Sequence, residues 1–190
     1  MLNKDVDMRA DCAKILVDTD TLNATVSRLA REIEDTYRDS DKQLVMVVIL
    51  KGSMPFAADL MKKINLPLQL EFMKVSSYGA GTKSSGEIKV SLDLKRDDLQ
   101  DIDLLVVEDI VDSGRTLSRL TQLLKNRNAN SVRTCTLLDK PSRREVDFTP
   151  DFCGATIPDE FVVGYGLDYD EKYRNLPFVG VLKREVYEQK

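Results

Sequence analysis

The sequence predicts an α/β fold with a mostly parallel central sheet flanked by helices. Short apolar runs rich in β-branched residues recur along the chain, and segments with helical periodicity separate them. The runs are apolar at consecutive positions, which is typical of strands buried on both faces of a sheet. With 190 residues, 42% of them hydrophobic, the chain can bury a sizeable core. We therefore assign residues 1–190 to a single domain, with a small lobe built from its two ends.

The first predicted element is an amphipathic helix over Thr21–Arg38, because apolar residues recur there at helical spacing. The run LVMVVIL (Leu44–Leu50) predicts a buried strand, and a helix over Met54–Ile64 follows it. The later elements are expected to be two strands, a helix and two further strands, over Leu68–Val75, Asp103–Val107, Thr116–Lys125, Val132–Leu138 and Phe161–Gly164. The Gly- and Ser-rich segment Ser76–Gly86 is interpreted as a mobile loop, with a plain hairpin connection as the alternative.

Composition excludes several classes of function. The chain has no histidine, so Ser-His-Asp and Cys-His nucleophile systems and imidazole metal sites are impossible. With 28 Lys+Arg against 32 Asp+Glu, the net charge of −4 argues against general nucleic-acid binding without excluding a local basic patch. The first residues lack the apolar run of a signal peptide, and the longest apolar stretch is too short to cross a bilayer. We expect a cytoplasmic protein with no membrane partner, whose three cysteines are buried and reduced: Cys12, Cys135 and Cys153.

The segment VVEDIVDSGRT (Val106–Thr116) combines the features of a phosphate site. An apolar strand runs into acidic residues, and a Ser-Gly turn then opens a helix. In open α/β sheets, ligands bind at the carboxyl ends of strands, and a helix N-terminus offers unpaired N–H groups. Gly114 permits close backbone approach, while Ser113 and Thr116 add hydroxyl donors. The segment contains neither a P-loop nor a dinucleotide-binding glycine motif.

Three carboxylates beside a phosphate site need separate roles, because they would otherwise repel the phosphate. Glu108 and Asp109 are adjacent and suit the vicinal diol of a ribose, or a Mg²⁺ bound to it. Asp112 is suited to stabilising a cationic transition state or to accepting a proton. The alternative interpretation is structural, with a helix-capping Asp and a solvated acidic strand end.

This segment resembles the PRPP-binding signature of type I phosphoribosyltransferases. Four further segments resemble the hypoxanthine and hypoxanthine-guanine branch of that family and follow in the family's order: LKGS (Leu50–Ser53), SSYG (Ser76–Gly79), LLDKP (Leu137–Pro141) and FVVGYGLDYDEKYRNLP (Phe161–Pro177). The resemblance covers nearly all of the chain from Leu44 onward. It implies the type I phosphoribosyltransferase fold, with a small hood lobe beside the parallel sheet.

The resemblance also implies a Mg²⁺-dependent reaction of purine salvage. A free purine, expected to be hypoxanthine with guanine as a second substrate, attacks C1′ of PRPP. Pyrophosphate leaves, and IMP or GMP forms through an oxocarbenium-like transition state. A homodimer or homotetramer is implied as well, with no nucleic-acid partner. Two alternatives stay open: a relative that prefers xanthine or guanine, and a PRPP-sensing regulatory protein that acts through nucleic acid.

Site residues carry over from the family by position. The 5′-phosphate is expected against the loop that opens the helix, namely Asp112, Ser113, Gly114, Arg115 and Thr116. Arg115 stands at the variable position, so only its backbone N–H is assigned. Glu108 and Asp109 are expected to hold the ribose hydroxyls and their Mg²⁺, and Asp112 to receive or share the proton at purine N7.

The pyrophosphate and purine sites are implied in the same way. Lys51-Gly52 matches the pyrophosphate loop, Arg174 a pyrophosphate contact, and Ser77-Tyr78 the loop that closes over the site. Asp168 matches a ligand of the Mg²⁺ on pyrophosphate. The purine pocket is implied at Lys140, Phe161, Val162 and Asp168. The Lys140 ammonium has only donors and would select a 6-oxo group over a 6-amino group. From the residues alone, Lys140 reads as a surface lysine, and Phe161 and Val162 as strand core.

Overall fold

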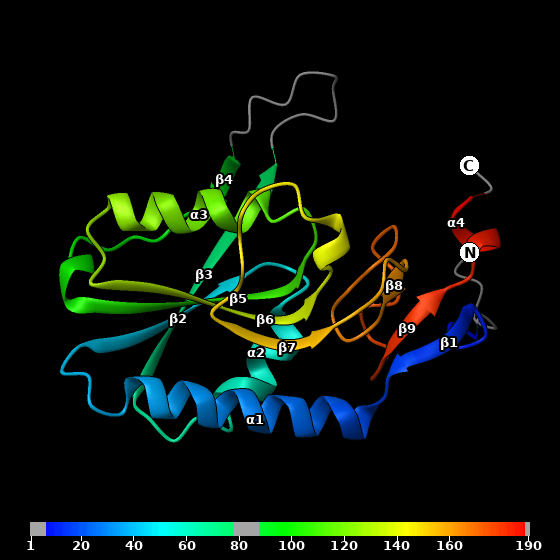
Figure 1. The fold of residues 1–190 in the computed structure, drawn as a ribbon, viewed down its shortest axis with the longest axis horizontal. Helices are drawn as coiled ribbons and strands as arrows, with labels where there is room; N and C mark the ends of the chain where they lie inside the picture. Colours follow the sequence, from blue (N-terminus) through cyan, green and yellow to red (C-terminus); the bar gives the residue numbers. More distant parts are fainter. Residues whose placement is uncertain (1–6, 78–87, 189–190) are drawn as a thin grey trace.

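The computed structural model describes residues 7–77 and 88–188, and its centre is a six-stranded sheet with strand order β4-β3-β2-β5-β6-β7 (Figure 1). The β2–β3, β2–β5, β5–β6 and β6–β7 pairs are parallel, and only the edge pair β3–β4 is antiparallel. This arrangement confirms the predicted fold class. The strands are β2 (Gln43–Ile49), β3 (Leu68–Ser77), β4 (Ile88–Leu92), β5 (Ile102–Val111), β6 (Ser131–Asp139) and β7 (Phe152–Thr156).

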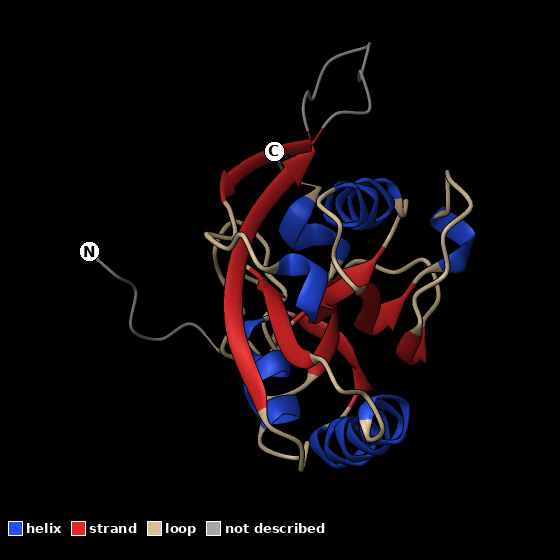
Figure 2. Ribbon diagram, turned by 90° about the vertical axis from the view of Figure 1, so that its left-hand side faces the viewer, coloured by secondary structure: helices blue, strands red, loops and turns tan. Residues whose placement is uncertain are grey.

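Helices cover both faces of this sheet, as Figure 2 shows. The helices α1 (Thr19–Tyr37) and α2 (Met54–Met61) pack on one face, and α3 (Arg115–Asn126) packs on the other. Successive residues of a strand point to opposite faces, so Leu105 and Val107 join the α1 side while Leu104 and Val106 join the α3 side. Two-sided burial explains why these strands are apolar at consecutive positions.

A small antiparallel sheet forms a separate lobe, the hood, beside the carboxyl ends of the central strands (Figure 1). Its strand order is β1-β9-β8, over Cys12–Val17, Val179–Leu182 and Val162–Val163. Segments near both ends of the chain therefore build it, in agreement with the predicted small lobe. The short helix α4 (Arg184–Tyr187) follows β9 and packs on the hood.

Several boundaries differ from the sequence prediction. The first helix begins two residues earlier, at Thr19, with the Asp18 side chain accepting a 2.8 Å hydrogen bond from the Thr21 N–H. Ser76 and Ser77 belong to β3 rather than to a loop, and β3 pairs with β4 as a hairpin. The rest of the predicted mobile segment lies outside the described residues. The prediction missed β1, β4, β7 and β9, which are short or only partly buried.

The cysteines and the helices bear on two other expectations. Cys135 is buried in the main core as predicted, whereas Cys12 and Cys153 are only partly buried, and all three are free thiols. Burial raises the pKa of the Cys135 thiol. No helix in the described part of the chain is both long enough and apolar enough to span a membrane.

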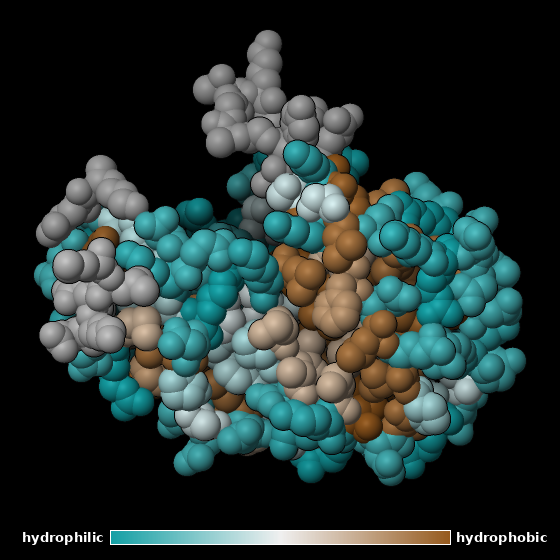
Figure 3. Space-filling view, turned by 180° about the vertical axis from the view of Figure 1, so that it is seen from behind, coloured by the Kyte–Doolittle hydropathy of each residue, from teal (hydrophilic) through white to brown (hydrophobic). Residues whose placement is uncertain are grey.

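One face of the molecule carries a continuous apolar band that follows β3 (Figure 3). Leu70 and Phe72 lie two residues apart and therefore on the same face of the strand, with 38% and 42% of their surfaces exposed. Leu92 on β4 and Met54 at the start of α2 are exposed as well. A continuous patch of exposed apolar side chains is typical of a surface that contacts another molecule.

Candidate active site

The predicted site residues gather at the carboxyl ends of three neighbouring parallel strands. Lys51 and Gly52 follow β2, Glu108 and Asp109 lie in the last part of β5, and Lys140 follows β6. Because β2, β5 and β6 are adjacent and parallel, their carboxyl ends share one edge of the sheet. This edge is where open α/β folds bind their ligands.

Glu108 and Asp109 form a half-buried acidic pair within β5. The Asp109 N–H donates a 3.2 Å hydrogen bond to Oε1 of Glu108. Burial raises the pKa of Glu108 well above its ordinary value, and the neighbouring Asp109 carboxylate adds to this effect. Burial also raises the pKa of Asp109. In their charged form, both carboxylates would therefore be stabilised by a bound cation or by hydroxyl donors, which replace the water removed by burial.

The turn after β2 lies directly against this acidic pair. A Cβ atom on Gly52 would lie 1.6 Å from Oδ2 of Asp109, so any larger residue would displace that carboxylate. The peptide bond between Leu50 and Lys51 is cis. The buried Ser53 hydroxyl donates to the carbonyl of Ile49 at 2.5 Å and ties the turn to its strand.

Four charged residues close the other side of this turn. Arg174 lies between two acids, with Nη2 at 2.8 Å from Oδ1 of Asp168 and 3.5 Å from Oε2 of Glu171. Glu171 also pairs with Lys51 at 3.0 Å. Nη1 of Arg174 donates to the carbonyl of Gly166, which itself packs against Gly52. The structure thus brings the predicted pyrophosphate residues Lys51, Gly52 and Arg174 together with Asp168.

The loop between β5 and α3 forms a second part of the site. Gly114 has a φ of +80°, a left-handed conformation that favours glycine, and it caps the N-terminus of α3. A cavity of about 250 Å³ is bounded by this loop and the acidic strand end, including Glu108, Asp112, Ser113, Gly114 and Thr116. The first N–H groups of α3 have no acceptor within the helix, so the loop is suited to an anion.

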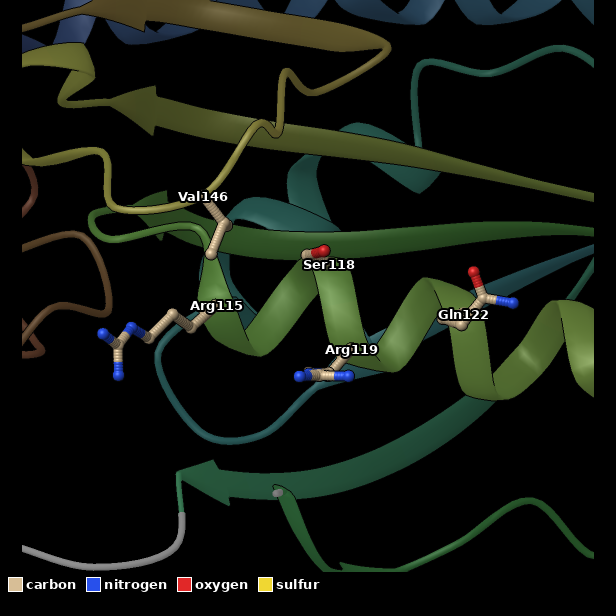
Figure 4. Close-up of a pocket in the computed structure, with 5 residues that line it drawn as sticks. All are labelled: Arg115, Ser118, Arg119, Gln122 and Val146. Atoms are coloured by element: carbon tan, nitrogen blue, oxygen red, sulfur yellow. The ribbon is translucent and has the colours of Figure 1, made fainter. Parts of the chain in front are cut away.

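The side chain of Arg115 does not line that cavity. It contributes to a separate hollow of about 320 Å³ on the flank of α3, together with Ser118, Arg119 and Gln122 (Figure 4). Its guanidinium pairs with Glu145, with Nη2 at 2.6 Å from Oε2. This placement agrees with the expectation that only the backbone of Arg115 belongs to the phosphate loop.

A third cavity, of about 380 Å³, lies between the central sheet and the hood. Lys140, Phe161 and Val162 all line it, and Asp112 forms its border with the phosphate loop. Lys140 is only 8% exposed, and its Nζ donates a 2.6 Å hydrogen bond to the carbonyl of Glu160. The surface-lysine interpretation of Lys140 is therefore wrong. Asp168 is not among the described residues that line this cavity, because it lies with Arg174.

Sequence reasoning missed several residues in or beside this cavity. Nε of Arg143 lies 3.3 Å from Oδ1 of Asp112, so this carboxylate has a cationic partner. Arg144 donates to the Asp112 carbonyl at 2.6 Å and pairs with Asp139. The basic pair shortly after Lys140 was the available signal for both arginines. Tyr187 also lines the cavity, and no motif in the sequence pointed to it.

The donor set at the strand ends can be tested for a divalent cation. Among the described residues, no group of three or more His, Cys, Asp or Glu side chains is close enough to hold a metal unaided. Glu108 and Asp109 still fit Mg²⁺, because this ion is commonly held by one or two carboxylates together with substrate oxygens and water. Ser77 ends β3, with only its backbone described, and Tyr78 lies outside the described residues.

Comparison with known proteins agrees with this geometry. The phosphoribosyl transferase domain model matches residues 14–170. A hypoxanthine-guanine phosphoribosyltransferase of Bacillus subtilis is 48% identical over 181 residues, which cover 95% of this chain and 99% of that protein. The crystal structure of a hypoxanthine phosphoribosyltransferase from Staphylococcus aureus is similar with a TM-score of 0.90, at 44% identity, covering 97% of this chain and 98% of that one.

The fold and the strand-end site are those of the phosphoribosyltransferase class. The chain belongs to the type I phosphoribosyltransferase family, in its hypoxanthine and hypoxanthine-guanine branch. Some relatives are longer: the bifunctional protein TilS/HprT of Listeria monocytogenes is 48% identical over 182 residues, which are 96% of this chain and 28% of that protein. The chain thus spans about a quarter of the length of those bifunctional relatives.

Proposed function

We propose that this protein transfers the 5-phosphoribosyl group from PRPP to hypoxanthine and guanine, giving IMP or GMP and pyrophosphate. The observation that carries this proposal is the position of Asp112. Asp112 lines both the phosphate-loop cavity and the cavity that contains Lys140 and Phe161. A base in the second cavity would therefore lie next to a ribose whose 5′-phosphate occupies the first.

The reaction is a substitution at C1′ of the ribose. The bond from C1′ to the pyrophosphate oxygen breaks, and a bond from a purine nitrogen to C1′ forms. The loop Asp112–Thr116 would hold the 5′-phosphate, and Glu108 and Asp109 would hold the ribose hydroxyls. Asp112 would receive or share the purine proton, and its negative charge would stabilise the cationic ribose. In this role it exchanges its contact with Arg143 for a contact with the base.

We propose Mg²⁺ as the cofactor. Glu108 and Asp109 would hold it at the ribose hydroxyls, and Asp168 would hold it on the pyrophosphate side. When bound, the ion neutralises charge on the leaving pyrophosphate. Lys51, the backbone of Gly52 and Arg174 would contact the same anion. The pairing of Lys51 with Glu171, and of Arg174 with Asp168, keeps these cations in position before the substrate arrives.

Lys140 would select the base. Its Nζ has three hydrogens and no lone pair, so it donates to a 6-oxo group and has nothing to offer a 6-amino group. The buried position of Lys140 supports this role, because a desolvated donor that faces the wrong substrate group is costly. Phe161 would stack on the purine, and backbone carbonyls near Val162 would read its 2-position.

A rate comparison tests the proposal. We expect the highest kcat/KM with hypoxanthine or guanine as substrate, with PRPP and Mg²⁺ present, and a far lower value with adenine. Highest activity with xanthine would assign the protein to the alternative substrate preference. Specific RNA or DNA binding at physiological salt, with no nucleotide formed from any purine, would instead favour a regulatory protein. The acidic net charge of −4 weighs against that outcome.

We further propose that residues 1–190 form one cytoplasmic domain that self-associates as a homodimer or homotetramer. The apolar band at Met54, Leu70, Phe72 and Leu92 is the surface that we propose for this contact. Met54 is 56% exposed and starts the helix that follows Lys51, Gly52 and Ser53. A second copy bound to this band would bury these apolar side chains. It would also pack against the start of α2, which follows the pyrophosphate turn directly.

A further inference from the structure

Three aromatic rings pack against one another at the border of the hood and the large cavity: Phe161, Tyr169 and Tyr187. The rings of Phe161 and Tyr187 are stacked, with centroids 4.8 Å apart and an angle of 21° between planes. Tyr169 meets Phe161 edge-on at 5.6 Å and 87°, and meets Tyr187 at 6.4 Å and 67°. One face of the Phe161 ring is therefore covered by Tyr187, while 39% of Phe161 stays exposed.

The position of the Tyr187 ring is set by the strand that leads to it. The N–H of Leu182, at the end of β9, donates a 2.8 Å hydrogen bond to the carbonyl of Phe161. The next N–H, that of Lys183, donates to the carbonyl of Asp11 at 3.0 Å. Val186 and Tyr187 then pack against the hydrophobic core of the hood, which contains Phe178 and Leu182. The chain segment that carries Tyr187 is thus tied to the backbone of Phe161 itself.

Tyr187 bounds the large cavity without filling it. The cavity keeps a volume of about 380 Å³ with the ring in place, and its walls include Tyr187 together with Lys140 and Phe161. A ring that blocked the base site would leave no such space. Phe161 lines the same cavity and keeps 39% of its surface exposed.

We propose that Tyr187 is a positioning residue for the purine, which acts by stacking on Phe161 and fixing the plane against which the base lies. This inference rests on the proposed function, because it assigns the base to this cavity. A Phe side chain without such support can rotate about its side-chain bonds, and the base would then have to order it on binding. The geometry fixes the ring before the base arrives. Tyr187 therefore affects binding of the base and of the nucleotide, but not of PRPP.

The test is a comparison of steady-state constants for wild type, Tyr187→Leu and Tyr187→Phe. Aromatic pairs contribute on a scale that corresponds to about a three- to tenfold change in an equilibrium constant. We expect Tyr187→Leu to raise KM for hypoxanthine by about that factor, with KM for PRPP unchanged. Tyr187→Phe keeps the ring and should restore the wild-type constants. Directly measured Kd values for IMP and PRPP should show the same split.

A double-mutant cycle tests whether Tyr187 acts through Phe161. In a Phe161→Leu background, Tyr187→Leu should add little further increase in KM for hypoxanthine. Val186→Ala is the matched control, because it weakens the packing of the same short helix and alters none of the three aromatic side chains. It should leave both KM values at the wild-type level. If Tyr187→Leu does not fold, Tyr187→Met, with a flexible side chain of similar reach, replaces it.

The outcomes separate this inference from the proposed function. A wild-type protein that forms no nucleotide from hypoxanthine and PRPP overturns both. An active wild type with unchanged or lowered KM for hypoxanthine in Tyr187→Leu overturns the inference alone. An equal rise in both KM values, or a full additional rise in the Phe161→Leu background, also overturns it, because either result assigns Tyr187 a general structural role.

Discussion

Gly52 lies so close to Asp109 that a single added carbon would occupy the space of the carboxylate, at 1.6 Å from Oδ2. We expect Gly52→Ala to push the acidic pair and the turn apart and to lower kcat/KM for PRPP by about 10²-fold, since small displacements in a site have effects of that size. Steady-state kinetics measure this loss. Gly154→Ala is the control: its Cβ would lie 2.3 Å from the carbonyl oxygen of Leu137, so it should lower stability and leave KM for PRPP unchanged.

Asp112→Asn keeps the size of the side chain, replaces one accepting carboxylate oxygen by a donating NH₂ group and removes the negative charge. We expect kcat to fall by about 10²- to 10⁴-fold, the usual range for a lost proton acceptor, with a smaller change in PRPP binding. Single-turnover rates and a PRPP titration measure the two quantities. Glu145→Gln, which alters an acid paired with the outward-facing Arg115, serves as the control. An unchanged kcat in Asp112→Asn would exclude it from proton transfer.

Lys140→Met removes the ammonium and keeps most of the apolar stem. We expect kcat/KM for hypoxanthine and guanine to fall by about 10- to 100-fold, the value of a hydrogen bond from a charged donor, and the preference over adenine to shrink. Lys14 provides a matched control, because its Nζ also contacts Glu160, at 3.2 Å from the side-chain oxygen, but on the exposed surface. Lys14→Met should leave the base preference intact. An equal loss for every base would contradict the selectivity role.

Asp103 supplies a prediction on stability and pH. It is 4% exposed and accepts hydrogen bonds from Ser40, Asn130 and Ser131. Burial alone would raise its pKa, but these hydrogen bonds and the nearby Arg133 hold the pKa below its ordinary value. We expect Asp103→Ala to lower the free energy of unfolding by about 2–4 kcal/mol, because three donors lose a charged acceptor.

The sign of the pH dependence follows from the lowered pKa of Asp103. Its contribution is present above the unfolded-state pKa of about 3.9, and it is lost as the pH falls through the lower folded-state pKa. Urea unfolding at several pH values should therefore show the difference between wild type and Asp103→Ala narrowing only in acid. Asp101→Ala, which removes the exposed partner of Lys42, is the control and should change stability little. A difference that grows in acid would contradict the assignment.

Phe72→Lys tests the proposed contact along β3. A charge in the centre of the apolar band should dissociate the assembly, and analytical ultracentrifugation should report a monomer. Ile15→Lys, at a comparably exposed apolar position on the hood, should leave the assembly intact. A wild-type protein that sediments as a monomer at micromolar concentration would contradict the proposal.

The long strands of the parallel sheet could be predicted from the sequence. Strands buried on both faces are apolar at consecutive positions, as in Leu44–Leu50. The prediction missed β1 and β9, since short strands of a small antiparallel sheet carry little periodic signal. The predicted strand Asp103–Val107 also ends too early, because acidic residues follow Val107 in the sequence. Sheet pairing continues through them to Val111, which pairs with Asp139.

The site could be predicted where a motif fixes the local backbone, and not where distant segments meet. The phosphate loop and Lys140 are local patterns in the sequence. The contact of Arg143 with Asp112, and of Tyr187 with Phe161, joins residues from separate loops and helices. Such contacts depend on how the hood packs against the central sheet, which no single segment encodes.

The pairing of β1 with β9 joins Cys12 to Leu182, so the hood closes over almost the whole length of the chain. Contacts between such distant residues carry a large loop-closure cost and form late in folding. During synthesis, β9 leaves the ribosome long after the central parallel strands. We therefore expect that a nascent chain can form its phosphate loop before the wall of its base cavity, because that wall depends on the pairing at Leu182.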